Sequence, residues 1–293
     1  MTTERKINGT YTGASIHWVG DGFRVSNYFP SGNDFGSRIS PYILMDHHPV
    51  YSHPATDNER RGVGPHPHRG FETVSLAFEG SVAHHDSLGN AGVIGPGDAQ
   101  WMTAASGILH REYHEKAYAK AGGPMHFAQI WVDLPKAHKM DPPRYQDLVA
   151  DQMGLVTLAD GAGIVRVVAG EFQGTKGPAK TFSPINLYDI RLNPQGQVDL
   201  SFPARENTAL LVLDGSVTIN GKVTAKTRDF VLFENEGEDI TVVAGARSHL
   251  LLLNGEPLDQ PVVQYGPFVM TSIEEVNQAI TDFNSGTFGE LAD

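Results

Sequence analysis

Three polar side chains that could bind a metal lie in one short segment, "GPHPHRGFETV" from Gly64 to Val74. His66 and His68 are two residues apart, and Glu72 follows four residues after His68. Residues i and i+2 of a β-strand point to the same face, so both histidines can project into one interior. Glu72 can join them if the strand stays regular. The segment is therefore either part of a metal site or a polar, solvated loop.

A second segment, "GILHREYH", has the same kind of spacing, with His110 and Glu112 two residues apart. The turn residues "GPGD" and the run "AQWMTAASGI" precede it, and we expect them to let the two ligand-bearing strands lie side by side. Nitrogen and oxygen ligands without sulfur suit Fe(II), Mn, Ni, Cu(II) or Zn. The chain has no cysteine, which excludes disulfides, thiolate ligands and cysteine nucleophiles.

The elements that would position these residues are short β-strands. The chain has 32 glycines and 18 prolines, and its apolar runs are short and separated by turn signals. Such spacing predicts an all-β sandwich or barrel fold. The strand candidates in the first half include "SPYILMD", "ETVSLAFEGSVAHHD" and "MHFAQIWVDL".

The pattern of strands repeats, which predicts two domains. The segment "HPHRGFETVSLAFEGSV" from His66 corresponds to "FPARENTALLVLDGSV" from Phe202, and "ILHREY" corresponds to "DITVVA". Phe202 and Ala204 replace His66 and His68, so only the first half keeps the polar ligands. We place the domains at residues 1–143 and 144–293, with "LPKAHKMDPPRYQDL" as the connector between them.

The segment "SIEEVNQAITDF" near the C-terminus predicts one amphipathic helix. Ser272 and Glu275 form a capping box, and one apolar face follows. That face is formed by Ile273, Val276, Ile280 and Phe283.

The net charge and the N-terminal segment indicate which classes of partner and which location to expect. Lys and Arg number 22 against 34 Asp and Glu, so the formal charge is −12, which disfavours direct binding to nucleic acid. The start "MTTERKINGTY" has no apolar signal segment, and no apolar run is long enough to span a bilayer. We expect a cytoplasmic protein without a membrane segment, and a monomer.

The motifs "HPHRGFETVS", "GPGDAQWMTA", "GILHRE" and "PVVQYGPFVM" resemble those of the pirin family, and the resemblance spans nearly the whole chain. It implies two tandem cupin barrels, double-stranded β-helices that face each other, plus the C-terminal helix. It also implies that only the N-terminal barrel binds a metal, through His66, His68, His110 and Glu112. The implied metal is one divalent first-row ion, Fe(II) first, with Cu, Ni, Mn, Co or Zn as alternatives.

The resemblance implies a quercetin 2,3-dioxygenase activity, in which O₂ opens a small flavonol-like aromatic substrate. Many cupins take their glutamate ligand from a position like Glu72, but the pirin pattern assigns Glu112 to the metal. Glu72 is then either the catalytic base for the substrate hydroxyl or a hydrogen-bonding group that orients a ligand histidine. Two alternatives are a regulatory protein whose iron state controls a protein partner, and a metal-free storage or structural bicupin.

Other histidines and aromatic residues receive weaker predictions. The segment "MDHHPV" with His53 reads as a loop whose histidines are solvated or structural, although one could border the cavity. At most one of His84 and His85 can point inward, because adjacent strand residues face opposite sides. His126 reads as a hydrogen-bonded core histidine. Candidates for an apolar wall around an aromatic substrate are Phe71, Phe78, Met102 and Trp131.

Overall fold

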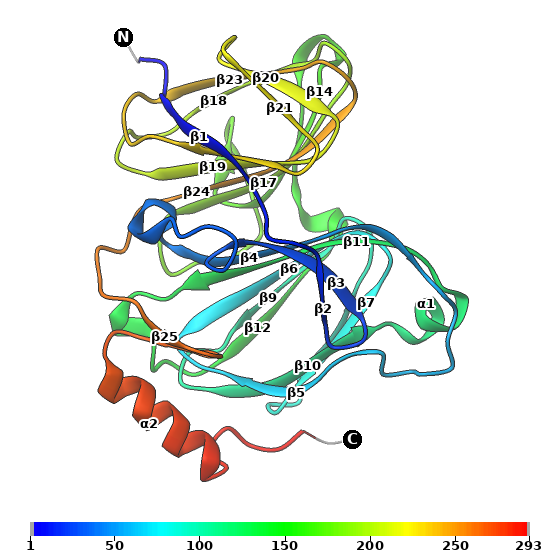
Figure 1. The fold of residues 1–293 in the computed structure, drawn as a ribbon, viewed down its shortest axis with the longest axis vertical. Coiled ribbons are helices and arrows are strands. Elements are labelled where there is room, and N and C mark those ends of the chain that lie inside the picture. The colour runs from blue at the N-terminus through cyan, green and yellow to red at the C-terminus, as the bar shows by residue number, and fades with distance from the viewer. Residues whose placement is uncertain (1–2, 292–293) are drawn as a thin grey trace. The chain divides into compact units, whose positions relative to one another are not determined.

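Strands form most of the regular structure (Figure 1). The computed structural model describes residues 3–291, and within that range the α-helices are α1 (Lys116–Ala121) and α2 (Ile273–Asn284). The many glycines and prolines divide the chain into short strands joined by turns. The predicted all-β fold with a C-terminal helix is confirmed. None of the described helices is long and apolar enough to cross a membrane.

Contacts divide the chain into two units that do not follow a single boundary. One unit contains residues 15–27, 42–150 and 259–293, and we call it the histidine-rich unit. The second unit contains residues 1–14, 28–41 and 151–258. The chain therefore divides differently from the predicted boundary at 143/144, because segments from both ends pair with strands far away in the sequence.

The histidine-rich unit has two large antiparallel sheets and a two-stranded sheet of β25 (Val263–Tyr265) and β26 (Phe268–Met270). The seven-stranded sheet has, in spatial order, the strands β12 (Arg144–Leu148), β9 (Ala99–Thr103), β6 (Phe71–Glu79), β11 (Gly123–Asp133), β4 (Tyr42–His53), β3 (Phe23–Phe29) and β2 (His17–Val19). The four-stranded sheet has the strands β5 (Gly62–His68), β10 (Ile108–His114), β7 (Val82–Asp86) and β8 (Ala91–Ile94). The predicted connector is thus partly the edge strand β12 of this unit.

The second unit repeats this arrangement of seven plus four strands. Its larger sheet has the order β1 (Ile7–Thr12), β22 (Asp229–Phe233), β19 (Asn207–Asp214), β24 (Ser248–Gly255), β17 (Ile185–Leu192), β14 (Gly163–Ala169) and β13 (Gly154–Thr157). Its smaller sheet has the order β18 (Gln197–Ser201), β23 (Asp239–Ala244), β20 (Ser216–Ile219) and β21 (Val223–Lys226). The predicted internal repeat is confirmed, since β18 and β23 pair as β5 and β10 do.

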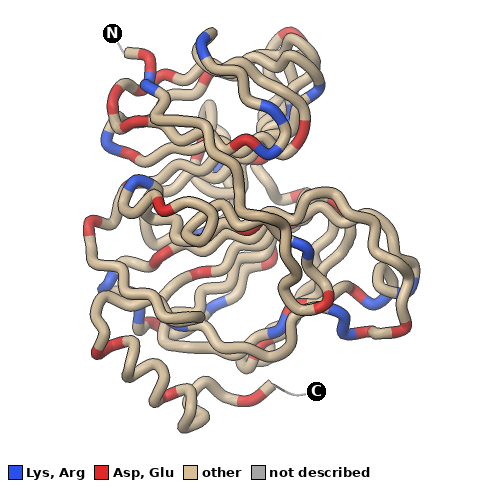
Figure 2. Tube along the Cα trace, viewed as in Figure 1, with Lys and Arg blue, Asp and Glu red and all other residues tan. Residues whose placement is uncertain are grey.

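The two units differ in what fills the space between their sheets. In the second unit a continuous apolar cluster includes Leu200, Phe202, Ile240 and Val242 from the region of β18 and β23. In the histidine-rich unit the equivalent strands carry His66, His68 and His110 instead. Basic and acidic residues are interspersed along the trace of both units (Figure 2).

The helix α2 begins at the predicted capping box. Ser272 Oγ accepts a hydrogen bond from the backbone N–H of Glu275, and Glu275 accepts one from the N–H of Thr271. The buried face differs from the predicted one. Val276 and Ala279 are buried, whereas Ile273 and Phe283 are 54% and 37% exposed.

Candidate metal centre

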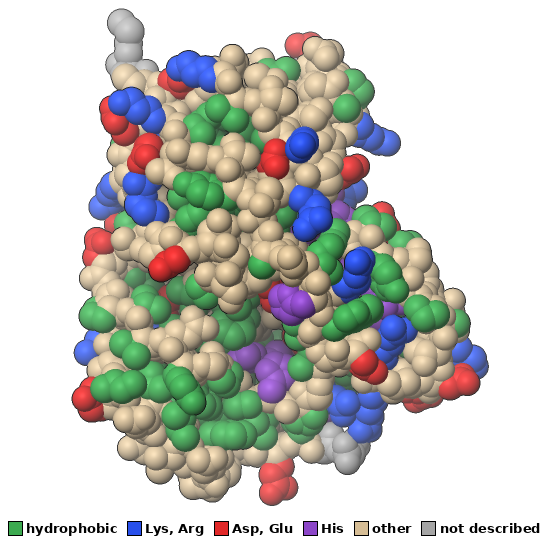
Figure 3. All heavy atoms as spheres, in the orientation of Figure 1, with side chains coloured by type: hydrophobic (Ala, Val, Ile, Leu, Met, Phe, Trp, Pro, Cys, Tyr) green, Lys and Arg blue, Asp and Glu red, His purple; other side chains and the backbone are tan. Residues whose placement is uncertain are grey.

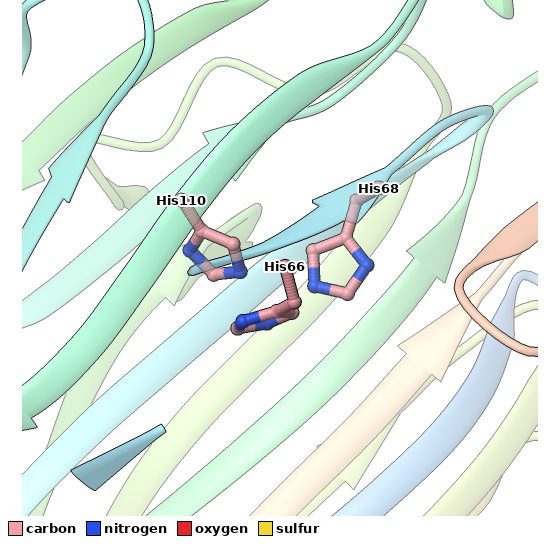
Figure 4. Close-up of side chains that lie close together, drawn as sticks. All are labelled: His66, His68 and His110. Carbon is pink, nitrogen blue, oxygen red and sulfur yellow. The ribbon is translucent and has the colours of Figure 1, made fainter. Parts of the chain in front are cut away.

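The predicted histidines come together from two paired strands (Figure 4). Strands β5 and β10 run antiparallel with His66 opposite His110, and His68 follows on the same strand as His66. The three residues each offer a ring nitrogen, and these nitrogens all lie within 4.8 Å of one another. The turn "GPGD" at residues 95–98 joins β8 to β9, so the pairing of β5 with β10 does not depend on it directly.

The buried environment of two of these imidazoles, His68 and His110, favours the neutral form that metal binding requires. His68 and His110 are buried, and burial, followed by the neighbouring imidazoles, lowers the pKa of each well below 6.5. His66 is half-buried, and its Nδ1 lies 2.8 Å from the backbone oxygen of Gly64. That contact makes Nδ1 the donor and leaves Nε2 free as a ligand.

A buried ring nitrogen of the histidine cluster indicates that the cluster binds a metal ion. His110 Nε2 is buried and has no hydrogen-bond partner among the described residues. A lone pair without a partner in the interior is costly unless something else satisfies it. Three imidazoles around one point form a donor set typical of divalent first-row metals.

Glu112, the fourth predicted ligand, lies on β10 two residues after His110. Its carboxylate is buried and accepts hydrogen bonds from Ser75 Oγ at 3.1 Å, Gln100 Nε2 at 2.9 Å and Gln129 Nε2 at 2.7 Å. All three donors are neutral, so they orient the carboxylate without neutralising it. The structure groups only the three histidines within ligand distance, and metal binding by Glu112 stays a prediction.

A row of polar side chains crosses the inner face of the larger sheet at the level of Glu112. Gln129 is the register partner of both Asp46 and Ser75, and Ser75 is in turn the partner of Gln100. A cavity of about 30 Å³ lies beside Glu112 and Gln129 and extends to Asp46, with Phe23, Phe127 and other apolar side chains on its walls. Burial raises the pKa of Asp46, although a hydrogen bond from Asn27 opposes the shift.

Comparison with known proteins decides the family. A family model described as "Pirin" matches residues 22–132, and one described as "Pirin C-terminal cupin domain" matches residues 187–289. A Pseudomonas aeruginosa protein with the name "Putative quercetin 2,3-dioxygenase" is 45% identical over 284 residues, which cover 97% of this chain and 98% of the relative. The chain belongs to the pirin family.

Further similarities support the same assignment. The protein named "Pirin" from Homo sapiens is 38% identical over 257 residues, which cover 86% of this chain and 83% of the human protein. A crystal structure of quercetin 2,3-dioxygenase from Acinetobacter baumannii is 40% identical, with a TM-score of 0.94, and the match covers 99% of this chain and 100% of that one. The predicted cupin fold is therefore confirmed for this pirin.

Glu72 lies away from the three histidines, on the other face of its sheet. Strand β5 ends at His68, and the chain turns at Gly70, whose φ is +90°, before β6 begins at Phe71. The strand is therefore not regular from His66 to Glu72, which the shared-face argument required. Along β6 the inward-facing residues include Phe71 and Ser75, so Glu72 points outward.

On that outer face Glu72 has its own partners. Its Oε1 accepts a hydrogen bond from Thr103 Oγ1 at 2.6 Å and lies 3.8 Å from a guanidinium nitrogen of Arg144. Burial raises the pKa of Glu72 to about 7, although the Thr103 hydrogen bond opposes the shift. These contacts give no support to Glu72 as the base or as a hydrogen-bonding partner of a ligand histidine.

Residues 267–269, near the C-terminus, hydrogen-bond the turn that follows His68. The sequence analysis did not predict this contact. The backbone N–H of Arg69 donates to Pro267, and the N–H of Val269 donates to the carbonyl of Arg69. The buried guanidinium of Arg69 forms an ion pair with Asp282 of α2 at 2.8 Å. The carbonyl of Pro267 also faces the His68 ring and partly offsets the lowering of its pKa.

A buried lysine supports the same turn. Lys139 Nζ forms an ion pair with Asp133 and donates to the carbonyls of Gly70 at 2.8 Å and Val269 at 3.0 Å. The only sequence signal for this contact was the basic residue within the predicted connector.

Three histidines that were predicted to lie in a loop are part of a strand and are buried. His47, His48 and His53 belong to strand β4 instead of a loop, and all three are buried. His47 Nε2 lies 2.9 Å from His126 Nε2, and His53 Nε2 lies 3.3 Å from His48 Nε2. The prediction of a loop was wrong, whereas His126 is a hydrogen-bonded core histidine as expected.

Two of the four residues predicted to form an apolar wall around an aromatic substrate lie beside the histidine cluster. Phe71 and Trp131 pack together with centroids 4.3 Å apart, and both touch His68, at 5.0 Å and 5.2 Å. Phe78 instead contacts His126, and Met102 packs in a small apolar cluster with Ile108. In the space-filling view, histidine side chains come to the surface among apolar side chains (Figure 3).

Proposed function

We propose that this pirin is a metal-dependent dioxygenase of the quercetinase type, which opens a flavonol-like aromatic substrate with O₂. The observation that carries the proposal is the convergence of three imidazoles from His66, His68 and His110 on one point. The similarity to the Acinetobacter baumannii quercetin 2,3-dioxygenase over the whole chain supports the same activity. We propose Fe(II) as the metal and Glu112 as the fourth ligand.

The metal would supply a Lewis acid and a route for electrons between the aromatic substrate and O₂. The residues around the histidines determine how a substrate reaches the site and what surface it meets there. His66 is half-buried whereas His68 and His110 are fully buried, so the site is approached from the side of His66. Phe71 is fully buried and packs against Trp131 beside His68, and the half-buried ring of Trp131 offers an apolar surface to an aromatic ring.

The hydrogen bonds to Glu112 would orient it toward a metal. Ser75, Gln100 and Gln129 hold the carboxylate in one orientation, and none of them carries a charge that would compete with a cation. We assign no proton transfer to Glu72, because its carboxylate hydrogen-bonds Thr103 on the outer face.

The test is turnover of quercetin by the metal-loaded protein. The full chain is stripped of metal, loaded anaerobically with Fe(II), Ni(II), Mn(II), Co(II), Cu(II) or Zn(II) in turn, and mixed with quercetin before air is admitted. We expect loss of the flavonol absorbance, uptake of O₂ and release of carbon monoxide with at least one metal. His110→Ala should abolish all three signals, whereas His85→Ala should leave them unchanged.

Failure with every metal would contradict the dioxygenase proposal. Tight metal binding without turnover would instead favour the regulatory alternative. Unchanged metal content and stability in His110→Ala would favour the metal-free alternative.

A further inference from the structure

His84 lies directly behind the ligand His110, on the neighbouring strand. Strand β7 pairs with β10, with Asp86 opposite His110 and His84 opposite Glu112. The His84 side chain is buried, whereas His85 is half-buried and contacts Tyr113. The prediction that at most one of the two adjacent histidines faces inward is confirmed, and that residue is His84.

The two ring nitrogens of His84 have different partners. Its Nδ1 lies 3.3 Å from His110 Nδ1, and its Nε2 lies 3.5 Å from a carboxylate oxygen of Asp86. Asp86 is itself fixed, because it accepts hydrogen bonds from the Asn90 side chain and from the backbone N–H groups of Leu88 and Asn90. The Asp86 carboxylate, His84 and His110 thus lie in a row, although the 3.5 Å contact between Asp86 and His84 Nε2 is an ion-pair distance and His84 Nε2 has no hydrogen-bond partner among the described residues.

The nearby carboxylate favours one tautomer of His84. A carboxylate attracts an N–H group and repels a lone pair, so the position of Asp86 favours the tautomer of His84 with its proton on Nε2. Nδ1 of His84 is then an acceptor, and Nδ1 of His110 must carry the proton between the two rings. The lone pair of His110 therefore lies on Nε2, the atom that is buried without a partner among the described residues.

Tyr145 lies between His84 and Gln100, the residue that donates a hydrogen bond to Glu112. Its ring stacks on His84 with centroids 4.9 Å apart and an angle of 10°. Its hydroxyl lies 3.4 Å from Gln100 Oε1, and the amide nitrogen of Gln100 donates to Glu112. One residue of the edge strand β12 therefore touches the supports of two proposed ligands.

We propose that His84, oriented by Asp86 and Tyr145, is a positioning residue that fixes the ring and tautomer of His110 so that Nε2 binds the metal. The proposal rests on the metal site proposed above but not on the reaction, since it concerns metal affinity. Loss of a group that hydrogen-bonds a ligand histidine in this way typically costs about 10-fold to 100-fold in metal affinity.

The test is the dissociation constant of Ni(II) for the full metal-free chain, measured by competition with a chelator. His84→Phe keeps a ring against Tyr145 but has no nitrogen to accept from His110. We expect it to weaken Ni(II) binding about 10-fold to 100-fold. His84→Gln, whose amide oxygen can accept from His110 Nδ1, should restore part of the affinity. His85→Phe, on the same strand but facing away, is the matched control.

A second readout separates positioning from general damage to the fold. The Co(II)-loaded protein should show an altered visible absorption spectrum in His84→Phe, while the melting temperature of the metal-free variant shows whether the fold persists. If His84→Phe does not fold, Tyr145→Leu tests the same support by removing the stacked ring, with a smaller loss of affinity expected.

The outcomes distinguish this proposal from the dioxygenase proposal. Wild-type affinity and an unchanged Co(II) spectrum in folded His84→Phe or Tyr145→Leu would overturn the positioning role, whatever the activity. A wild-type chain that binds Ni(II) but does not consume quercetin would leave the positioning role intact and overturn only the reaction. A wild-type chain that binds no metal would overturn both.

Discussion

His110 lies opposite His66 across the paired strands β10 and β5, and the centroids of their rings are 4.3 Å apart. Without a metal, two imidazoles at this distance gain little from each other. With a metal, both are held by one ion, so binding should stabilise the folded chain by an amount that grows with the logarithm of the metal concentration above its dissociation constant.

We expect added Ni(II) to raise the melting temperature of the wild-type chain and to leave that of His66→Ala or His110→Ala unchanged. The two variants should differ in the absence of metal, because His110 is fully buried and its loss leaves a cavity, whereas His66 is half-buried. Differential scanning calorimetry checks both points. An equal rise in the wild type and both variants would contradict a site built on these residues.

Gln129→Leu should destabilise the metal-free protein by about 1–3 kcal/mol, because it leaves an oxygen of the buried Glu112 carboxylate without its donor at 2.7 Å. Urea unfolding at neutral pH measures this. Gln197→Leu is the control for the same substitution, since Gln197 is exposed and its side chain hydrogen-bonds only Asp199 among the described residues. Its free energy of unfolding should change by less than about 0.5 kcal/mol. Equal effects of the two substitutions would contradict the buried role of Gln129.

Glu72→Gln should become more stable relative to the wild type as pH rises. Burial raises the pKa of Glu72 to about 7 from an ordinary value of 4.5, so between these values the folded chain holds a proton that the unfolded chain has released. Stability therefore falls across this window in the wild type, and glutamine does not titrate. The difference in free energy of unfolding should grow by roughly 3 kcal/mol from pH 4.5 to pH 8.

The same variant tests the role of Glu72 in turnover. Because its carboxylate points to the outer face, Glu72→Gln should keep its metal and its activity. Loss of quercetin turnover with metal content and stability retained would restore Glu72 as the candidate base.

Gly70→Ala should destabilise the histidine-rich unit by more than about 2 kcal/mol and weaken metal binding. Gly70 has a φ of +90°, and a Cβ there would lie 1.9 Å from the carbonyl oxygen of Val269. Gly64→Ala is the matched control, because Gly64 also lies on the segment of the ligands but has open space around its Cβ position. Chemical unfolding and Ni(II) titration of both variants check this, and equal stabilities would show that the turn tolerates a side chain.

Local patterns were sufficient to predict the strand class, the repeat and the helix cap. Alternation places His66 and His68 on one face whatever the rest of the chain does, and the capping of α2 involves only residues 271–275. The loss of ligands in the second half was visible as the replacement of His66 and His68 by Phe202 and Ala204. These features depend on neighbours in the sequence, which a single sequence records.

Only the tertiary structure decided which face of its sheet Glu72 occupies. Spacing left both Glu72 and Glu112 open and the pirin resemblance assigned Glu112, whose role as a ligand stays a prediction. The turn at Gly70 moves the chain from the smaller sheet to the larger one, and Glu72 then faces outward. The position of that turn depends on Val269, Lys139 and Asp282, which are far away in the sequence. Contacts between residues far apart in the sequence leave no periodic signal. The sequence therefore could not predict the role of the C-terminal segment or the support of His110 by His84.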